Sequence, residues 1–282
     1  MIAKLLIQAN EVQNKTLLVV VLTIFVLVIF YYSLKALETI YIIRNKKPLF
    51  VHFYIIKKRL PSNQKSILKG FTFYNRLQPI EQRYFEHRVA SFINDKDYIG
   101  RKEIEITDEM RVLTAATAVM LTFGFRDYFI GLIDKIIIFP KEFYSNFNQD
   151  YHKGEFNPKL KALVLSWEHF KLGYAIENDK LNVGIHEFTH AIHLNSLKER
   201  DISSNIFQDS YKELVELLSS NEQLRDDLIK SKYFRSYAYT NQYEFIAVII
   251  ESFIESPTEL RSSFPHIYAK VKQMLNFNFK GY

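Results

Sequence analysis

The sequence predicts a mainly helical α+β domain with one small sheet, preceded by a single apolar helix near the N-terminus. Three observations lead to this prediction. Residues 16–34 contain no charged side chain. Two short runs rich in β-branched and apolar residues, 134–140 and 161–167, are typical of strands. Longer segments such as 107–124 and 240–257 have the apolar spacing of helices that bury one face.

The composition limits both the fold and the chemistry. The chain has 282 residues, which is enough for one sizeable domain and an appendage. Its apolar fraction of 48% predicts a packed core and excludes wholesale disorder. The sequence contains no cysteine, so disulfides, cysteine-ligated zinc, iron–sulfur clusters and thiol nucleophiles are excluded. Any metal must therefore be held by His, Asp or Glu.

The uncharged run 16–34, TLLVVVLTIFVLVIFYYSL, is long enough as a helix to cross the hydrocarbon core of a bilayer. A buried core helix seldom runs this far without a charge. A cleaved signal peptide is the other alternative, but the following YYSLKALET lacks a small-x-small cleavage pattern. We interpret the run as an uncleaved anchor in the lipid bilayer, with Tyr31 and Tyr32 near one interface.

Basic residues gather after this run. Before it, Lys4 and Lys15 are opposed by Glu11. After it, only Glu38 opposes Lys35, Arg44, Lys46, Lys47, Lys57, Lys58 and Arg59. The positive-inside rule then predicts a single-pass membrane protein whose large C-terminal part faces the cytoplasm. A nucleic-acid or anionic-lipid patch is the alternative for these cations. They lie near the predicted anchor without Gly/aromatic interleaving, so we expect no nucleic-acid partner.

The chain divides into three predicted parts: an N-terminal segment with the anchor (1–35), a juxtamembrane connector (36–74) and one domain (75–282). Pro61, Ser62 and Asn63 punctuate the connector. Within the domain we predict helices at 79–94, 107–124 and 182–197, two short helices within 207–232, and a helix at 240–257 that stops at Pro257. The small sheet lies just before the helix at 182–197.

The stretch NVGIHEFTHAIHL, 182–194, carries the chemistry. His186 and His190 lie one turn apart on one helix face, so both imidazoles can reach one Zn²⁺. Glu187 is offset sideways, where it can take a proton from an attacking water without being a ligand. The alternative is a surface helix with two unrelated histidines. The apolar neighbours weaken it, because buried His and Glu side chains need compensating partners; these neighbours are Val183, Ile185, Phe188, Ala191, Ile192 and Leu194.

A third ligand is expected from another element, which leaves an open position on the metal. His193 is a candidate, but it lies three residues past His190 on the same helix. The helix at 240–257 offers Glu244 and Glu251, seven residues apart and on nearly the same face. An alternative for Glu244 is a capping box with Asn241, in which its carboxylate only closes the helix start.

Four ordered segments resemble the Mlc titration factor A family of zinc metallopeptidases, which itself resembles the catalytic domain of anthrax lethal factor. They are IEITDEMRVLTAATAVMLTFG, KALVLSW, NVGIHEFTHAIH and YAYTNQYEFIAVIIESFIESP. The resemblance covers roughly residues 75 to 275 and leaves the predicted anchor outside. It implies a zincin-like fold and a Zn²⁺ cofactor.

Carried over position by position, the resemblance implies that His186, His190 and Glu244 are metal ligands and that Glu187 is the general base. It also singles out Tyr237, whose phenol would donate a hydrogen bond to the developing oxyanion. Glu251 would then orient a ligand histidine, although an ordinary carboxylate on the helix face is an equal alternative.

Two departures from the family stand out. The family usually continues its zinc motif as HEFAHxLD, and His193 stands here at the acidic position. Residues 195–235 also lack the Gly/Pro-containing pattern expected after the zinc helix. This segment would shape the substrate cleft, so substrate preference is not carried over.

Together these features predict a membrane-anchored, cytoplasm-facing zinc metallopeptidase acting on a peptide or protein substrate. The substrate would add a strand to the edge of the sheet containing 161–167. The rival from another class is a regulatory binding protein that sequesters a transcriptional repressor or other cytoplasmic partner, as the family's namesake does. A membrane-embedded protease fits poorly, because HEFTH lies in no long uncharged span.

Overall fold

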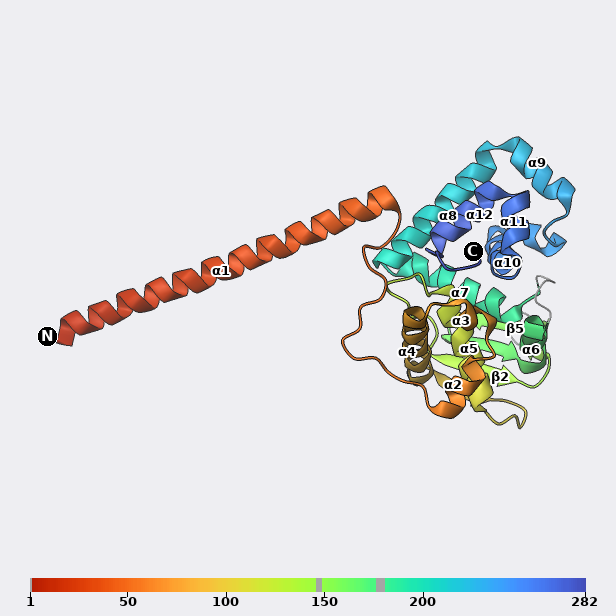
Figure 1. Ribbon diagram of the computed structural model, residues 1–282, viewed down its shortest axis with the longest axis horizontal. Helices are drawn as coiled ribbons and strands as arrows, with labels where there is room; N and C mark the ends of the chain where they lie inside the picture. The colour runs from red at the N-terminus through yellow and green to blue at the C-terminus, as the bar shows by residue number, and fades with distance from the viewer. Residues whose placement is uncertain (1, 146–148, 176–180) are drawn as a thin grey trace. The chain divides into compact units, whose positions relative to one another are not determined.

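The computed structural model describes residues 2–145, 149–175 and 181–282 (Figure 1). The chain divides into two compact units, Met1–Leu49 and Phe50–Tyr282. The first consists mainly of one helix, α1 (Ile2–Asn45). Its part Gln13–Asn45 is long and apolar enough to cross a membrane, a test that a signal sequence near the N-terminus also passes. The predicted apolar N-terminal helix is therefore confirmed.

The second unit contains a mixed four-stranded sheet in the order β1-β2-β6-β5. Strands β1 (Asp97–Gly100), β2 (Lys135–Phe139) and β6 (Ala162–Ser166) are parallel, and β5 (Gly154–Asn157) runs antiparallel to β6 at one edge. The two predicted strands are thus the two inner ones. A separate antiparallel pair is formed by β3 (Phe143–Ser145) and β4 (Asp150–His152).

The inner strands are the most apolar of the sheet. One face of β2 is buried and the other is partly exposed, whereas β6 is buried at four of its five positions. Ile136 and Ile138 of β2 and Leu163 and Leu165 of β6 are fully buried. Edge strand β5 alternates between buried and half-buried residues. The sheet is small, and its antiparallel edge strand β5 lies beside helix α7.

Two helices before the inner strands match the predictions at 79–94 and 107–124. Helix α4 (Pro79–Asp95) starts with a capping box between Gln78 and Glu81 and has Pro79 in its first turn. Helix α5 (Asp108–Leu121) is capped by Thr107, whose hydroxyl accepts from the Met110 amide. Helix α6 (Trp167–Ala175) directly follows β6.

The remaining chain is helical: α7 (Val183–Lys198), α8 (Ile202–Ser220), α9 (Glu222–Ser231), the 3₁₀ turn η1 (Ser236–Tyr239), α10 (Gln242–Glu255), α11 (Pro257–Ser263) and α12 (Pro265–Met274). The first helix predicted within 207–232 is longer than expected. It begins at Ile202, because the Asp201 carboxylate accepts from the Ser204 amide and caps it there. Helix α7 packs against α5, β5 and β6 as well as α8 and α10, and so lies between the sheet and the C-terminal helices (Figure 1).

Residues 50–74, predicted as part of a connector, include two short helices of the second unit, α2 (Ser62–Leu68) and α3 (Thr72–Arg76). They supply buried side chains to its core: Leu60, Leu68, Phe71, Phe73 and Tyr74. The predicted domain start at residue 75 lies inside this compact unit. Periodicity alone missed these helices because both are shorter than two turns.

Candidate metal centre

Helix α7 holds His186, Glu187 and His190 through a well-capped start. The Asn182 side chain accepts from the Ile185 amide at 3.0 Å and donates to the Gly173 carbonyl at 2.9 Å. Gly184 allows Phe170 of α6 to approach, because a Cβ at this position would lie 2.5 Å from the Phe170 ring. The first turn of α7 is therefore fixed on both sides.

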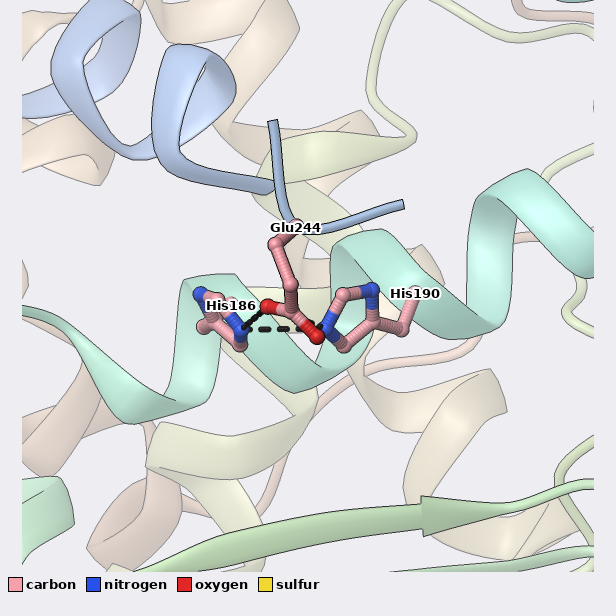
Figure 2. Close-up of side chains that lie close together, drawn as sticks. All are labelled: His186, His190 and Glu244. Carbon is pink, nitrogen blue, oxygen red and sulfur yellow. Dashed lines mark hydrogen bonds and ion pairs between the residues drawn. The ribbon is translucent and has the colours of Figure 1, made fainter. Parts of the chain in front are cut away.

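Helix α10 brings Glu244 to the same place. Asn241 caps this helix by accepting from the amides of Tyr243 and Glu244, both at 2.9 Å. The Glu244 carboxylate points down to α7, where it meets both histidines (Figure 2). Asn241 thus caps the helix, and the carboxylate of Glu244 is directed to His186 and His190 instead of closing the predicted capping box.

The three side chains converge on one point. Oε2 of Glu244 lies 3.0 Å from Nε2 of His186 and 3.4 Å from Nε2 of His190, and the two Nε2 atoms are 2.9 Å apart (Figure 2). All three donor atoms lie within 4.8 Å of one another. Tetrahedral ligands at about 2.0–2.1 Å from Zn²⁺ are separated by about 3.3 Å, so the spacing fits such an ion.

The electrostatics of the group also suit a cation. Burial opposes a charge on His186, but its hydrogen bonds to Glu244 and Glu251 outweigh burial and raise the pKa of His186 to about 10 in the metal-free protein. Burial would raise the pKa of Glu244, yet hydrogen bonds to His186 and His190 hold that pKa well below its usual range. The site therefore gathers negative charge that a proton or a metal ion must neutralise.

Glu251 supports His186 from behind. Its carboxylate accepts a hydrogen bond from Nδ1 of His186 and lies 3.0 Å from Nη2 of Arg235. None of its side chain is exposed. Because Glu251 holds the proton on Nδ1, a metal ion that displaces the Nε2 proton would meet the Nε2 lone pair, in the tautomer that a metal ligand requires.

Glu187 faces β5. Burial raises the pKa of its carboxyl group to about 7, and a hydrogen bond with the Phe156 backbone opposes this shift. Gly154 of the same strand leaves room for it, because a Cβ there would lie 2.6 Å from Cγ of Glu187. Glu187 therefore lies against the strand edge, beside the three converging donors and outside them.

Tyr237 lies on η1 at the same cleft. Its ring centroid is 6.0 Å from that of His186, and 49% of the residue is exposed. Partial burial and then the charge of Glu244 raise the pKa of its phenol to about 12. The phenol is thus protonated at neutral pH and can donate a hydrogen bond.

His193 lies apart from the converging donors. Its ring packs on Tyr211 at 4.6 Å and Phe207 at 6.1 Å, and its carbonyl accepts from Ser196. Burial lowers the pKa of His193 to about 4, which keeps it neutral. At the position where the resemblance led us to expect an acidic residue, this chain has a neutral imidazole packed against Tyr211 and Phe207.

Two residues that contact the histidines of the site were not predicted from the sequence. Tyr243 stacks on the His190 ring at a centroid distance of 3.8 Å and an interplanar angle of 5°. Arg235 contacts both Glu251 and Nδ1 of His186. Tyr243 could have been predicted, because it directly precedes Glu244 in the sequence. Arg235 could not, because the sequence around it shows no helical periodicity that would predict its position.

A cleft of about 600 Å³ opens at His186, Glu187 and Tyr237. Side chains and backbone from the β3–β4 region, β5, α6, α7, η1 and α10 line it: Glu142, Tyr151, His152, Lys153, Gly154, His169, Leu172, Leu181, Asn182, Val183, His186, Glu187, Arg235, Tyr237 and Glu251. The cleft is large enough for several residues of an extended peptide and reaches the candidate metal site directly.

Comparisons with known proteins relate this chain to one protein and to one family. A protein of Synechocystis sp. (strain PCC 6803), itself uncharacterized, is 24% identical over 242 residues, covering 78% of this chain and 85% of its own length. Residues 51–276 match the family model of the glucose-regulated metallo-peptidase M90, the family of Mlc titration factor A. The resemblance inferred from four sequence segments is thus confirmed, and the chain belongs to this metallopeptidase family.

Proposed function

We propose that this protein is a membrane-anchored, zinc-dependent peptidase whose catalytic domain faces the cytoplasm. One observation carries the proposal: His186, His190 and Glu244, from two separate helices, point their donor atoms at one position beside Glu187. Two imidazoles and one carboxylate form a donor set that favours Zn²⁺ and leaves a fourth position open. Membership of a metallopeptidase family supports the same chemistry.

A bound Zn²⁺ supplies Lewis acidity and makes water a nucleophile at neutral pH. The protein's own groups do the rest. Glu187 takes a proton from the attacking water and passes it to the leaving amine. Tyr237 donates a hydrogen bond to the oxyanion that develops on the scissile carbonyl. Glu251 and Arg235 keep His186 in the required tautomer and orientation.

The peptide would lie along β5. This strand pairs with β6 on one side and occupies the edge of the sheet, next to Glu187. An extended substrate can continue the sheet there through backbone hydrogen bonds, which bind peptides with little dependence on side chains. Proline or charged substitutions along β5 that leave cleavage unchanged would refute this arrangement.

The anchor is α1. Its uncharged stretch 16–34 matches the hydrocarbon thickness of a bilayer, and the cations that follow favour the cytoplasmic side for the C-terminal part. We accordingly assign 1–35 to the anchor segment, 36–49 to a juxtamembrane connector and the compact unit 50–282 to the peptidase domain.

The test measures zinc content and cleavage of short unstructured peptides by the purified full chain. His190→Ala should lose both the metal and the cleavage. His193→Asn is the matched control on the same helix and should retain both, because His193 lies outside the converging donors. A His190→Ala variant that keeps stoichiometric zinc would contradict the proposed ligand set.

A regulatory binding protein, which could hold a transcriptional regulator at the membrane, predicts a different outcome. Partner binding without hydrolysis would not depend on the carboxylate of Glu187. Retention of every cellular effect in a Glu187→Gln variant would therefore favour that role over peptide hydrolysis.

A further inference from the structure

We propose that residues 50–59, at the start of the second unit, form a docking loop that rests on the surface of a bilayer containing anionic lipids. The inference adds a second membrane contact to the proposed anchor α1. The docking loop itself and the contacts that hold it lie within the second unit, and its test separates it from the anchoring proposal.

The docking loop is fixed to the domain by its inward-facing residues. The Arg88 guanidinium is buried and donates to the Val51 carbonyl at 3.1 Å and to the Tyr54 hydroxyl. The His52 ring stacks on Tyr84 with a centroid distance of 4.6 Å. These contacts hold the backbone on both sides of Phe53, so the loop presents a defined outer face.

Apolar side chains occupy that outer face. Phe53 is 74% exposed, Ile55 91% and Ile56 84%. Three large apolar residues within four positions therefore point into solvent from a loop that is held on the domain by its other residues. Such a concentration on a soluble surface is typical of a contact with a membrane or another protein.

Three adjacent cations favour the membrane. Lys57, Lys58 and Arg59 follow the apolar residues directly, and all three are exposed. The ion pairs found among the described residues include none of them. Lys57 lies over the Tyr84 ring, 5.0 Å from its centroid. Exposed apolar residues beside exposed cations suit the interface of a bilayer with a negative surface.

The position in the chain points to the same occupant. The candidate membrane span ends at Asn45, eight residues before Phe53. An extended chain covers at most about 3.6 Å per residue, so the eight residues from Asn45 to Phe53 can span no more than about 29 Å. If α1 crosses a bilayer, the docking loop can reach its surface.

The test uses fluorescence quenching in nanodiscs. The sequence has no cysteine, so Ile24→Cys, Ile55→Cys and Ile229→Cys each give one site for an environment-sensitive fluorophore in the full chain. A nitroxide-labelled lipid then reports contact. Ile24 tests the anchor, Ile55 tests the docking loop, and Ile229 of α9, which is 59% exposed, is the matched control.

With anionic lipid we expect quenching at Ile24 and Ile55 and none at Ile229. Replacing Lys57, Lys58 and Arg59 by Gln in the Ile55→Cys chain should lower the ratio of docked to undocked loop about fivefold per cation, and neutral lipid should also lower it. Quenching at Ile24 without quenching at Ile55 would overturn the docking loop and leave the anchor intact. Quenching at Ile55 alone would support docking and refute the anchor. Equal quenching after the Gln substitutions and in neutral lipid would refute the role given to the cations.

Discussion

The carboxylate of Glu251 on α10 accepts a hydrogen bond from Nδ1 of His186 on α7, and the Glu251 side chain is fully buried. A buried carboxylate at this position fixes both the tautomer and the ring orientation of a histidine whose other nitrogen faces Glu244 and His190. The stacked ring of Tyr243 constrains the ring plane of His190, and no hydrogen bond to Nδ1 of His190 is found among the described residues.

We predict that Glu251→Gln weakens zinc binding about 10- to 100-fold, because a neutral amide accepts a weaker hydrogen bond from Nδ1 of His186 and so makes the imidazole a less basic ligand. Titration of the metal-free protein with zinc against a competing chelator measures the affinity. Glu216→Gln changes an exposed carboxylate on α8 and should leave it unaltered. Equal affinities for both variants would remove Glu251 from the metal site.

Tyr243 should act through its ring and not through its hydroxyl. Tyr243→Leu removes the face-to-face contact with His190 and should weaken zinc binding about fivefold, in line with the free energy of a stacked aromatic pair. Tyr243→Phe keeps the ring and should bind zinc like the parent chain. The same chelator competition distinguishes them, and a loss in Tyr243→Phe would assign the effect to the hydroxyl.

Gly154→Ala tests how closely β5 approaches Glu187. The new Cβ would lie 2.5 Å from Cγ2 of Val183 and 2.6 Å from Cγ of Glu187, so Glu187 must move. A displacement of about 1 Å in a catalytic group lowers the rate about 100-fold, and zinc content should stay unchanged. Gly131→Ala is the control, since its Cβ would meet nothing closer than 3.5 Å. Full activity in Gly154→Ala would show that this contact does not position Glu187.

Arg88 should be essential to the stability of the domain. Its guanidinium also donates to the carbonyls of Thr122, Phe123 and Phe125, just past the end of α5. Arg88→Met leaves several buried carbonyls without a donor and should destabilise the domain by more than about 3 kcal/mol. Urea unfolding measures this, with Arg83→Met on the exposed face of α4 as the control. A loss below about 1 kcal/mol would contradict the role given to Arg88.

His52 predicts an acid limit to stability. Burial and then the charge of Arg88 lower the pKa of His52 to about 3, below the value of about 6.5 in the unfolded chain. Between these values the unfolded state binds the proton more readily, so the contribution of neutral His52 is complete above pH 6.5 and is lost as the pH falls toward 3. His52→Gln should show a shallower loss of stability over this range in thermal unfolding. Identical slopes would show that His52 does not titrate on unfolding.

The sequence alone predicts those parts of the site that follow a local rule. The four-residue spacing of His186 and His190 determines a shared helix face, and the apolar runs of β2 and β6 identify the inner strands. Glu244 needed the family resemblance, because a carboxylate near Asn241 also satisfies a helix cap.

Other parts depend on tertiary contacts that no local pattern encodes. Strand β5 spells GEFN, which is too short and polar to be recognised, and it forms only because β6 pairs with it. Arg235 reaches Glu251 from a segment without helical periodicity. The role of residues 50–54 likewise follows from Arg88, which lies more than thirty positions later in the chain.

Cleavage by a Glu187→Gln variant at matched zinc occupancy tests the central claim most directly. Glutamine preserves the shape of the side chain. Glu187 is not one of the three converging metal ligands, so the variant should bind zinc like the parent chain. It cannot take up a proton, so peptide cleavage should fall by at least about 100-fold. Cleavage at the parental rate, with zinc bound equally in both proteins, would contradict the assignment of Glu187 as the general base of a peptidase.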